Sequence, residues 1–197
     1  MPRELTDQIA TALPSAAAVF AAKGIDATRM DDIASATGIP RATLYYHFGS
    51  KEDILAWLLE RLLRTVSNDV GVVMDQPGTS RERLARIIET HLGIYAENPD
   101  LCRVLLAELG RVTKIPALAE AIWTGFHEPV RKLLDAGCQD GTLREVDPEP
   151  TASALFGAIT MLGLHYIVTD QVLDVPKVAA QLDNLVIAGL AGHATPS

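Results

Sequence analysis

Two short helix patterns separated by a tight break lie between residues 28 and 51, and this spacing constrains the fold more than any other feature of the chain. The segment is TRMDDIASATGIPRATLYYHFGSK. Thr28 followed by Asp31 is typical of a capping box, so we expect a helix to begin directly after Thr28. Gly38 can adopt the positive φ that ends a helix, and the ring of Pro40 fits the first turn of the next one. The break is then three or four residues long, as a helix-turn-helix requires.

The second helix of this pair has an inward and an outward face. Leu44 and Phe48 are four residues apart and share the inward face. Ala42, Thr43 and Tyr46 point away from it, at about 100° per residue. The outward face is therefore the candidate for recognition of DNA.

Two cations near helix starts indicate an external anion. Arg41 lies in the first turn of the second helix, and Lys51 follows Ser50, the expected N-cap of the next helix. A cation is electrostatically unfavourable at a helix N-terminus. Phosphate would reverse that penalty, because helix-start amides and a nearby Lys or Arg bind it together.

The longer string SAAAVFAAKGIDATRMDDIASATGIPRATLYYHFGSKEDIL resembles the N-terminal domain of the TetR/AcrR family of transcriptional regulators. The resemblance covers roughly residues 10 to 57 and is carried by Phe20, Gly24, Thr28, Ile33, Ala34, Gly38, Thr43, Leu44, Tyr45, His47, Phe48 and Lys51. It implies an all-helical homodimer whose divergent C-terminal domain binds a small molecule that changes the affinity for DNA. Pro40 departs from the family pattern, in which a serine is common there, so the usual side-chain cap of the recognition helix is missing.

Pro14 falls inside the expected first helix. An interior proline costs about 3 kcal/mol, so either residues 3 to 12 form a separate arm or turn, or the helix is kinked. We favour a helix that starts at or near Pro14, and the preceding segment can still be helical.

Composition and patterning predict an all-α fold. Ala and Leu are abundant, and no alternating strand pattern is present. We expect an N-terminal three-helix helix-turn-helix DNA-binding domain at residues 1–51 and a C-terminal helical bundle for effector binding and dimerisation at residues 52–197. Beyond the N-terminal domain, helices are expected near 51–74, 80–97, 100–111, 116–140, 149–170 and 176–191.

The net charge of −8 is unevenly distributed along the chain. Residues 1–51 carry five basic and five acidic side chains, whereas the rest of the chain carries 12 basic and 20 acidic ones. A neutral DNA-binding domain gains little from counterion release, because each neutralised phosphate adds to affinity. We therefore expect two such domains to act together in a homodimer.

Cysteine usage and hydropathy favour the cytoplasm. Cys102 and Cys138 are too few for a disulfide framework, as expected for a reducing compartment. The longest apolar stretch, residues 152 to 168, has 17 residues, whereas a membrane span needs ~20. We expect a buried interface helix there and no membrane partner.

The helical angles, together with the resemblance, predict the DNA contacts. We expect Arg41 and Thr43 to reach base edges and Ala42 to contact a thymine methyl group. The remaining contacts would hold the DNA backbone and set the register: Tyr45, Tyr46, His47, Lys51, Thr28 and Arg29. Either tyrosine can also reach a base. The alternative for Tyr46 is plain surface, and the alternative for His47 is capping or packing against the turn.

Two late helices are the dimer candidates because apolar residues recur on them at steps of three and four. These residues are Leu155, Ile159, Leu162 and Tyr166, then Leu182, Leu185, Val186 and Gly189. The resemblance supports a four-helix interface made by two helices from each subunit. The alternative is ordinary core packing within one chain.

The effector candidates lie on the central helices, where an apolar cavity with a few polar groups is expected. They are Leu62, Val66, His91, Tyr95, Leu105, Leu109, Trp123, Phe126, His127 and Val130. The alternative for each is core packing. A metal site at His91, His127 and His165 is not expected, because the spacing is not that of a local ligand set, and no cofactor is expected.

No sequence motif supports catalysis: Gly-rich phosphate loops, nucleophile elbows and HExxH are absent from the sequence. We therefore expect a regulator and not an enzyme. The expected function is a repressor that a small, largely apolar effector releases from a near-palindromic, double-stranded DNA operator. The alternative is a constitutive DNA-binding or protein-interaction module without an effector pocket.

Overall fold

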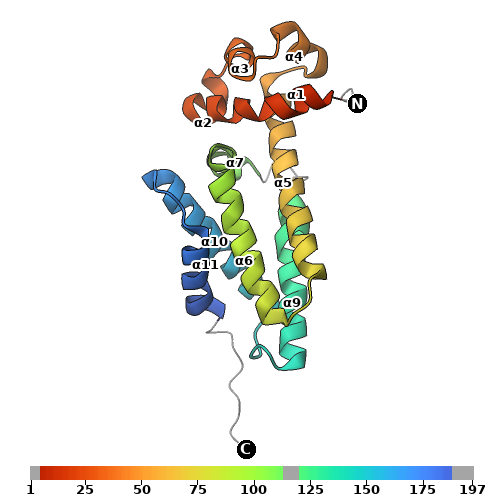
Figure 1. Ribbon diagram of the computed structural model, residues 1–197, viewed down its shortest axis with the longest axis vertical. Helices are drawn as coiled ribbons and strands as arrows, with labels where there is room; N and C mark the ends of the chain where they lie inside the picture. Colours follow the sequence, from red (N-terminus) through yellow and green to blue (C-terminus); the bar gives the residue numbers. More distant parts are fainter. Residues whose placement is uncertain (1–4, 113–119, 188–197) are drawn as a thin grey trace, which may run out of the picture. The chain divides into compact units, whose positions relative to one another are not determined.

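The computed structural model describes residues 5–112 and 120–187, and every element in these ranges is helical (Figure 1). The predicted all-α fold is therefore confirmed. The expected helix ends beyond residue 51 agree with the observed ones to within one residue wherever the structure describes them. Residues 116–119 and 188–191 of the expected helices lie outside the described ranges.

The chain divides into two compact units. One contains residues 1–62 and 100–111, and the other contains residues 63–99 and 112–197. The division between Leu62 and Leu63 falls inside the long helix α5 (Lys51–Asp75), so one continuous helix contributes to both units. The functional boundary expected after residue 51 stays a prediction.

The N-terminal unit begins with three short helical segments. These are α1 (Asp7–Ala12), the 3₁₀ turn η1 (Leu13–Ser15) and α2 (Ala16–Ala27). Pro14 lies within η1, where its missing N–H breaks no α-helical ladder. A helix thus starts two residues after Pro14, as expected, and the preceding segment is helical as well.

Two further helices, α3 (Met30–Thr37) and α4 (Arg41–His47), complete the N-terminal unit together with the start of α5 and with α7 (Pro99–Val112). Leu44 is 1% and Phe48 5% exposed, which confirms their predicted inward orientation. Full burial of a leucine side chain contributes about 1.5–3 kcal/mol, so Leu44 fixes α4 on its neighbours. The buried core of this unit also includes Leu13, Ala16, Phe20, Ile33, Ile54 and Leu58.

The C-terminal unit is a bundle built from the end of α5 and the later helices. These are α6 (Ser80–Glu97), the π-helical segment η2 (Trp123–His127), α9 (Glu128–Asp140), α10 (Pro148–Thr169), α11 (Val175–Leu182) and the π-helical segment η3 (Asp183–Ile187).

Polar side chains cap the starts of three helices in this unit. Thr79 and Glu82 form a reciprocal capping box at α6, with N···O distances of 2.8 and 3.2 Å. Asp147 and Asp174 accept backbone N–H groups at the starts of α10 and α11.

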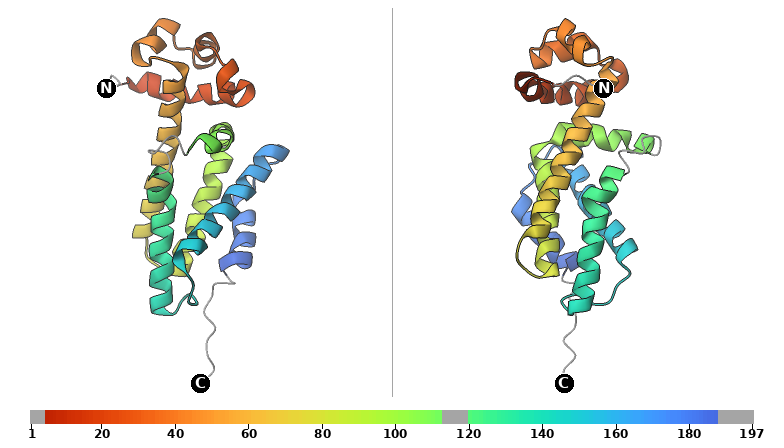
Figure 2. Two further views of the ribbon diagram at one scale, coloured as in Figure 1. Left: turned by 180° about the vertical axis from the view of Figure 1, so that it is seen from behind. Right: turned by 90° about the vertical axis from the view of Figure 1, so that its right-hand side faces the viewer.

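In this unit, α6 contacts α9, α10 and α11 (Figure 1). The helix α10 runs obliquely to α6 (Figure 2). Gly163 on α10 permits a close approach to α6, because a Cβ atom at this position would lie 2.5 Å from the ring of Tyr95. The shared core includes Leu84, Ile87, Leu92, Phe126, Leu134, Leu155 and Ile159.

The apolar stretch expected to form an interface helix lies in α10. By length and composition this helix could cross a membrane, and a third (33%) of its most apolar window is buried inside the protein. Core helices of soluble proteins meet the same criterion, and Ala152, Leu155 and Ile159 of α10 do pack into the bundle core.

Candidate nucleic-acid interface and effector region

The start of α3 differs from the prediction by one residue. Asp32, and not Asp31, accepts the hydrogen bond of a capping box, from the backbone N–H of Arg29 at 2.9 Å. Thr28 is not the N-cap: it is 2% exposed, and its hydroxyl donates to the carbonyl of Gly24 at 2.6 Å. The expected capping role of Thr28 was therefore wrong, because this threonine instead bonds back to the end of α2. Its assignment as a DNA contact stays a prediction.

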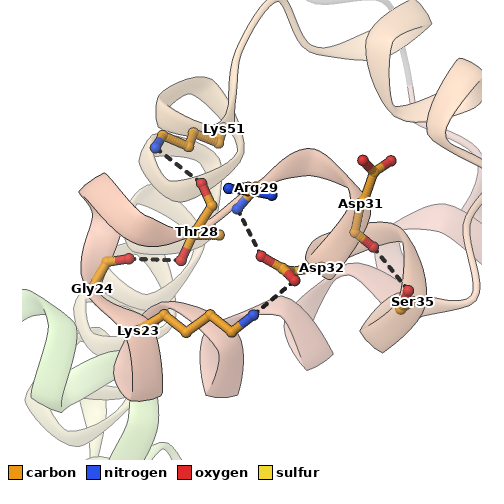
Figure 3. Close-up of polar contacts among 8 residues, drawn as sticks. All are labelled: Lys23, Gly24, Thr28, Arg29, Asp31, Asp32, Ser35 and Lys51. Atoms are coloured by element: carbon orange, nitrogen blue, oxygen red, sulfur yellow. Dashed lines mark hydrogen bonds and ion pairs between the residues drawn. The ribbon is translucent and has the colours of Figure 1, made fainter.

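Lys23 fixes the same junction from α2 (Figure 3). Its Nζ lies 2.7 Å from the carboxylate of Asp32. The hydrogen bond from Lys23 and then the backbone N–H of Arg29 lower the pKa of Asp32. Asp32 therefore stays ionised at neutral pH and holds the start of α3 against α2.

Lys51 ties the first turn of α5 to this junction. Its Nζ donates to the backbone carbonyls of Asp26 and Thr28, both at 3.0 Å, and Figure 3 shows the bond to Thr28. Ser50 is confirmed as the N-cap of α5, since its Oγ accepts from the N–H of Asp53 at 3.2 Å. The ammonium is therefore already compensated by carbonyl oxygens where α2 ends. Its additional role as a phosphate contact stays a prediction.

The turn of the helix-turn-helix consists of Gly38, Ile39 and Pro40. Gly38 has φ +69°, a left-handed conformation that glycine adopts without a steric penalty, as predicted. Pro40 lies at the N-cap position of α4, one residue earlier than the first-turn position expected for it. Ile39 is buried, at 6% exposure, and anchors the turn to the core.

Four side chains of α4 form its exposed surface. Arg41, Ala42, Tyr45 and Tyr46 are exposed, with Tyr46 at 60% and Tyr45 at 47%. Such large exposed aromatic side chains on a firmly packed helix are available for contacts with another molecule.

The other two candidates on α4, Thr43 and His47, are half-buried. The ring of His47 contacts the ring of Tyr46 edge-on at a centroid distance of 5.0 Å. The assignment of His47 as a DNA contact stays a prediction, as does its capping or packing alternative. Arg29, by contrast, is exposed at the start of α3.

Arg41 is paired with Asp31, an acidic residue that was expected only to cap α3. Its Nη1 lies 2.9 Å from both carboxylate oxygens of Asp31 on α3. Its Cζ lies 5.4 Å from the centre of the Tyr45 ring. A hydrogen bond with the Tyr45 side chain and then the charge of Asp31 raise the pKa of Arg41. The signal in the sequence was the acidic first turn of α3, which the tight break places beside the first turn of α4.

In the C-terminal unit, four of the effector candidates meet in one aromatic cluster. The ring of His91 contacts Phe126 edge-on at 4.6 Å, and Trp123 stacks on His127 at 5.6 Å. Phe156 on α10, which was not predicted, lies 5.2 Å from Phe126 and 5.3 Å from His127. Its position in a uniformly apolar stretch gave no periodic signal that would have singled it out.

The two histidines of this cluster are kept neutral by burial. Burial lowers the pKa of His91 to about 4, with the carbonyl of Ile87 acting in the opposite direction. Burial also lowers the pKa of His127, against the charge of Glu149. The Nδ1 atom of His127 is buried and has no hydrogen-bond partner among the described residues.

The remaining effector candidates lie at several different positions. Val130 is buried in the bundle core and Tyr95 packs against Gly163, whereas Val66 is half-buried on α5. Leu62, Leu105 and Leu109 belong to the N-terminal unit, and the side chain of Leu109 lies outside the described residues. Within residues 5–112 and 120–187, no three His, Cys, Asp or Glu side chains are placed to hold a metal ion.

The dimer candidates fall on two different faces. Leu155, Ile159 and Leu182 are at most 5% exposed and pack within their own chain. Leu162, Tyr166 and Val186 are partly buried against the same core. Leu185 is 79% exposed, and Gly189 lies outside the described residues. The interface assignment stays a prediction.

Two family models match the chain. The model described as "Bacterial regulatory proteins, tetR family" matches residues 12–58, which contain α3, α4 and the start of α5. The model described as "Tetracyclin repressor-like, C-terminal domain" matches residues 77–164. Together they span most of both units.

Curated relatives match over part of the chain. The biofilm operon icaADBC HTH-type negative transcriptional regulator IcaR of Staphylococcus aureus (strain Newman) is 48% identical over 42 residues, which are 21% of this chain and 23% of the relative. The HTH-type transcriptional repressor KstR2 of Mycobacterium tuberculosis is 39% identical over 71 residues, 36% of each chain. The matches thus span only 23% to 36% of the length of these relatives.

Solved structures match over nearly the whole chain. The fatty acid degradation regulator FadR from Bacillus halodurans has a TM-score of 0.83 at 21% identity, covering 97% of this chain and 100% of its own. FadR from Bacillus subtilis in complex with stearoyl-CoA has a TM-score of 0.78 at 22% identity, covering 92% and 98%. AibR in complex with isovaleryl coenzyme A and operator DNA has a TM-score of 0.72 at 19% identity, covering 91% and 98%.

Proposed function

We propose that this chain, which belongs to the TetR family of bacterial regulatory proteins, is a homodimeric repressor that a small molecule releases from its operator. Family membership confirms the resemblance seen in residues 10–57. The family consists of DNA-binding regulators without enzymatic activity, so the expectation that the chain is not an enzyme is confirmed as well.

The observation that carries this proposal is the exposed surface of α4 on a fixed scaffold. Leu44 and Phe48 anchor the helix in the core, while Arg41, Tyr45 and Tyr46 remain exposed. A recognition helix needs this combination, because base contacts discriminate only when the helix is held in one register. Arg41 and Thr43 are proposed to reach base edges, with Ala42 against a thymine methyl group.

We propose homodimerisation through the face of α10 and η3 that points away from the core. The exposed apolar side chains there are Met161 (57%) and Val168 (73%) on α10 and Leu185 (79%) on η3. Large exposed apolar side chains are typical of interaction sites, and an isologous pairing would present two α4 helices to successive major grooves, about 34–36 Å apart. A near-palindromic operator follows from that symmetry.

Coenzyme A thioesters are the proposed effector class. The FadR of Bacillus subtilis was solved with stearoyl-CoA and AibR with isovaleryl coenzyme A and operator DNA, and this chain shares their fold. The aromatic cluster of His91, Trp123, Phe126, His127 and Phe156 would accept an acyl chain, and the buried Nδ1 of His127 offers a polar partner. Because α5 contributes to both units, a shift of α5 would misalign the two DNA-binding units.

The test uses the full-length protein and duplexes from the DNA flanking its own gene. Fluorescence anisotropy would measure operator affinity without ligand, and then with short, medium and long acyl-CoA, free coenzyme A and the matching free fatty acids. We expect two chains per site and at least about a 5-fold loss of affinity with one chain-length class, because allosteric coupling is typically about 1–3 kcal/mol.

Operator binding that no compound weakens would favour a constitutive DNA-binding module. Action as a repressor in the cytoplasm is part of the same proposal. Deletion of the gene should raise transcription of the gene beside the bound site.

A further inference from the structure

We propose that Asp31 is a specificity-determining residue, which holds Arg41 ready for one base and prevents it from serving as a general phosphate contact. This inference rests on the proposed DNA-binding function of α4. It concerns a residue on the neighbouring helix α3, outside the recognition helix itself.

The pairing with Asp31 uses one nitrogen of the Arg41 guanidinium. Both contacts to the Asp31 carboxylate are made by one nitrogen, Nη1, at 2.9 Å each. Tyr45 also holds the guanidinium, through a side-chain hydrogen bond and with its ring centre 5.4 Å from Cζ. An arginine held in one orientation loses less conformational entropy when it binds a guanine edge, because its fork is already positioned.

The same pairing changes how Arg41 interacts with the DNA backbone. Both side chains are exposed, at 55% for Arg41 and 65% for Asp31, so the pair reaches the surface that DNA would approach. A neutral pair gains almost nothing from counterion release, whereas an unpaired Arg41 would neutralise a phosphate of any sequence. Asp31 would therefore suppress binding to non-operator DNA more than binding to the operator.

Asp31 is not needed to start α3, which separates this role from a purely structural one. Asp32 already accepts the backbone N–H of Arg29 and the ammonium of Lys23. The hydroxyl of Ser35 donates to the backbone carbonyl of Asp31 at 2.9 Å, a bond that does not involve the Asp31 carboxylate (Figure 3). Replacement of the Asp31 carboxylate by an amide should thus leave α3 intact.

The experiment compares wild-type protein with Asp31→Asn on the operator and on a scrambled duplex of equal length, over a range of salt concentrations. For Asp31→Asn we expect tighter binding to the scrambled duplex and a salt slope steeper by about 0.9 for one additional phosphate contact. We expect the ratio of the two affinities to fall about 2- to 10-fold, from the lost preorganisation of one side chain. Asp53→Asn is the matched control, because it removes one exposed carboxylate from the same unit without contact to Arg41. It should leave the ratio unchanged.

A second comparison places Asp31→Asn in an Arg41→Ala background, where the effect on the ratio should disappear. The inference is overturned if Asp31→Asn and Asp53→Asn change the ratio equally, or if the effect persists without Arg41. On operator variants with one base pair changed, it is also overturned if Asp31→Asn loses preference at a single cytosine, because Asp31 would then contact a base itself. A wild-type protein that prefers no duplex would instead refute the proposed function.

Discussion

Replacement of Lys51 by methionine removes the ammonium that joins α5 to the junction of α2 and α3, while keeping a side chain of similar length. The ammonium donates to the carbonyls of Asp26 and Thr28 at 3.0 Å each. A hydrogen bond to a charged group contributes about 1.5–3 kcal/mol net. The Lys51 side chain is 22% exposed, so water can replace part of each bond, and the lysine regains rotamer entropy when it is released. We expect a loss of about 1–2 kcal/mol in the free energy of unfolding of the N-terminal unit.

The two tryptophans of the chain allow this loss to be measured in one unit. Trp57 belongs to the N-terminal unit and Trp123 to the C-terminal unit. In a Trp123→Phe background, the fluorescence of Trp57 during urea unfolding reports on the N-terminal unit. Lys132→Met is the control, because Lys132 forms an exposed pair with Glu128 in the other unit and should leave the Trp57 transition unchanged.

Operator binding separates the internal role of Lys51 from a phosphate contact. We expect Lys51→Met to weaken operator binding while changing the salt slope by much less than the roughly 0.9 that one lost phosphate contact causes. An unchanged Trp57 transition together with a slope reduced by about 0.9 would refute the internal role. Lys51 would then be a phosphate contact alone.

Two further predictions concern the C-terminal unit. Because burial lowers the pKa of His91 to about 4, the unfolded chain binds a proton there between pH 6.5 and 4 that the folded chain does not. The free energy of unfolding should therefore fall as the pH drops from 7 to 4, by up to about 3 kcal/mol. In urea titrations, a His91→Gln variant should lack this loss of stability at low pH. The same pH dependence in the variant and the wild type would contradict the lowered pKa of His91. Gly163→Ala should destabilise the unit by about 1–3 kcal/mol, because its Cβ would lie 2.5 Å from the Tyr95 ring. The control is Gly71→Ala, whose Cβ meets nothing within 4 Å and which should be neutral or stabilising by up to about 1 kcal/mol. If thermal unfolding shows that both variants change the stability in the same direction, the close approach of Gly163 to Tyr95 would be refuted.

Local chemistry explains which parts of the fold were predictable. Helix ends depend on residues whose effects act within a few positions, such as Gly38, Pro40 and Ser50, so the sequence located most of them to within one residue. The inward orientation of Leu44 and Phe48 follows from helical periodicity and was predicted for the same reason.

Features that depend on packing between helices could not be predicted in this way. Ten residues separate Asp31 from Arg41, and only the geometry of the turn brings them together. The bonds from Lys51 to carbonyls more than 20 residues away in sequence depend on the same tertiary arrangement. Periodicity also could not tell which apolar face of α10 packs inside: Leu155 and Ile159 do, whereas Met161 and Val168 are exposed.

Arg41→Ala gives the most direct test that the outward surface of α4 reads DNA sequence. Affinities would be measured for wild-type and Arg41→Ala protein on the operator and on every single-base-pair variant of one half-site. We expect Arg41→Ala to lose discrimination at one or two positions, with about 1–3 kcal/mol lost there and the other positions unchanged. A uniform weakening across all variants would contradict this role, because Arg41 would then contact only the DNA backbone.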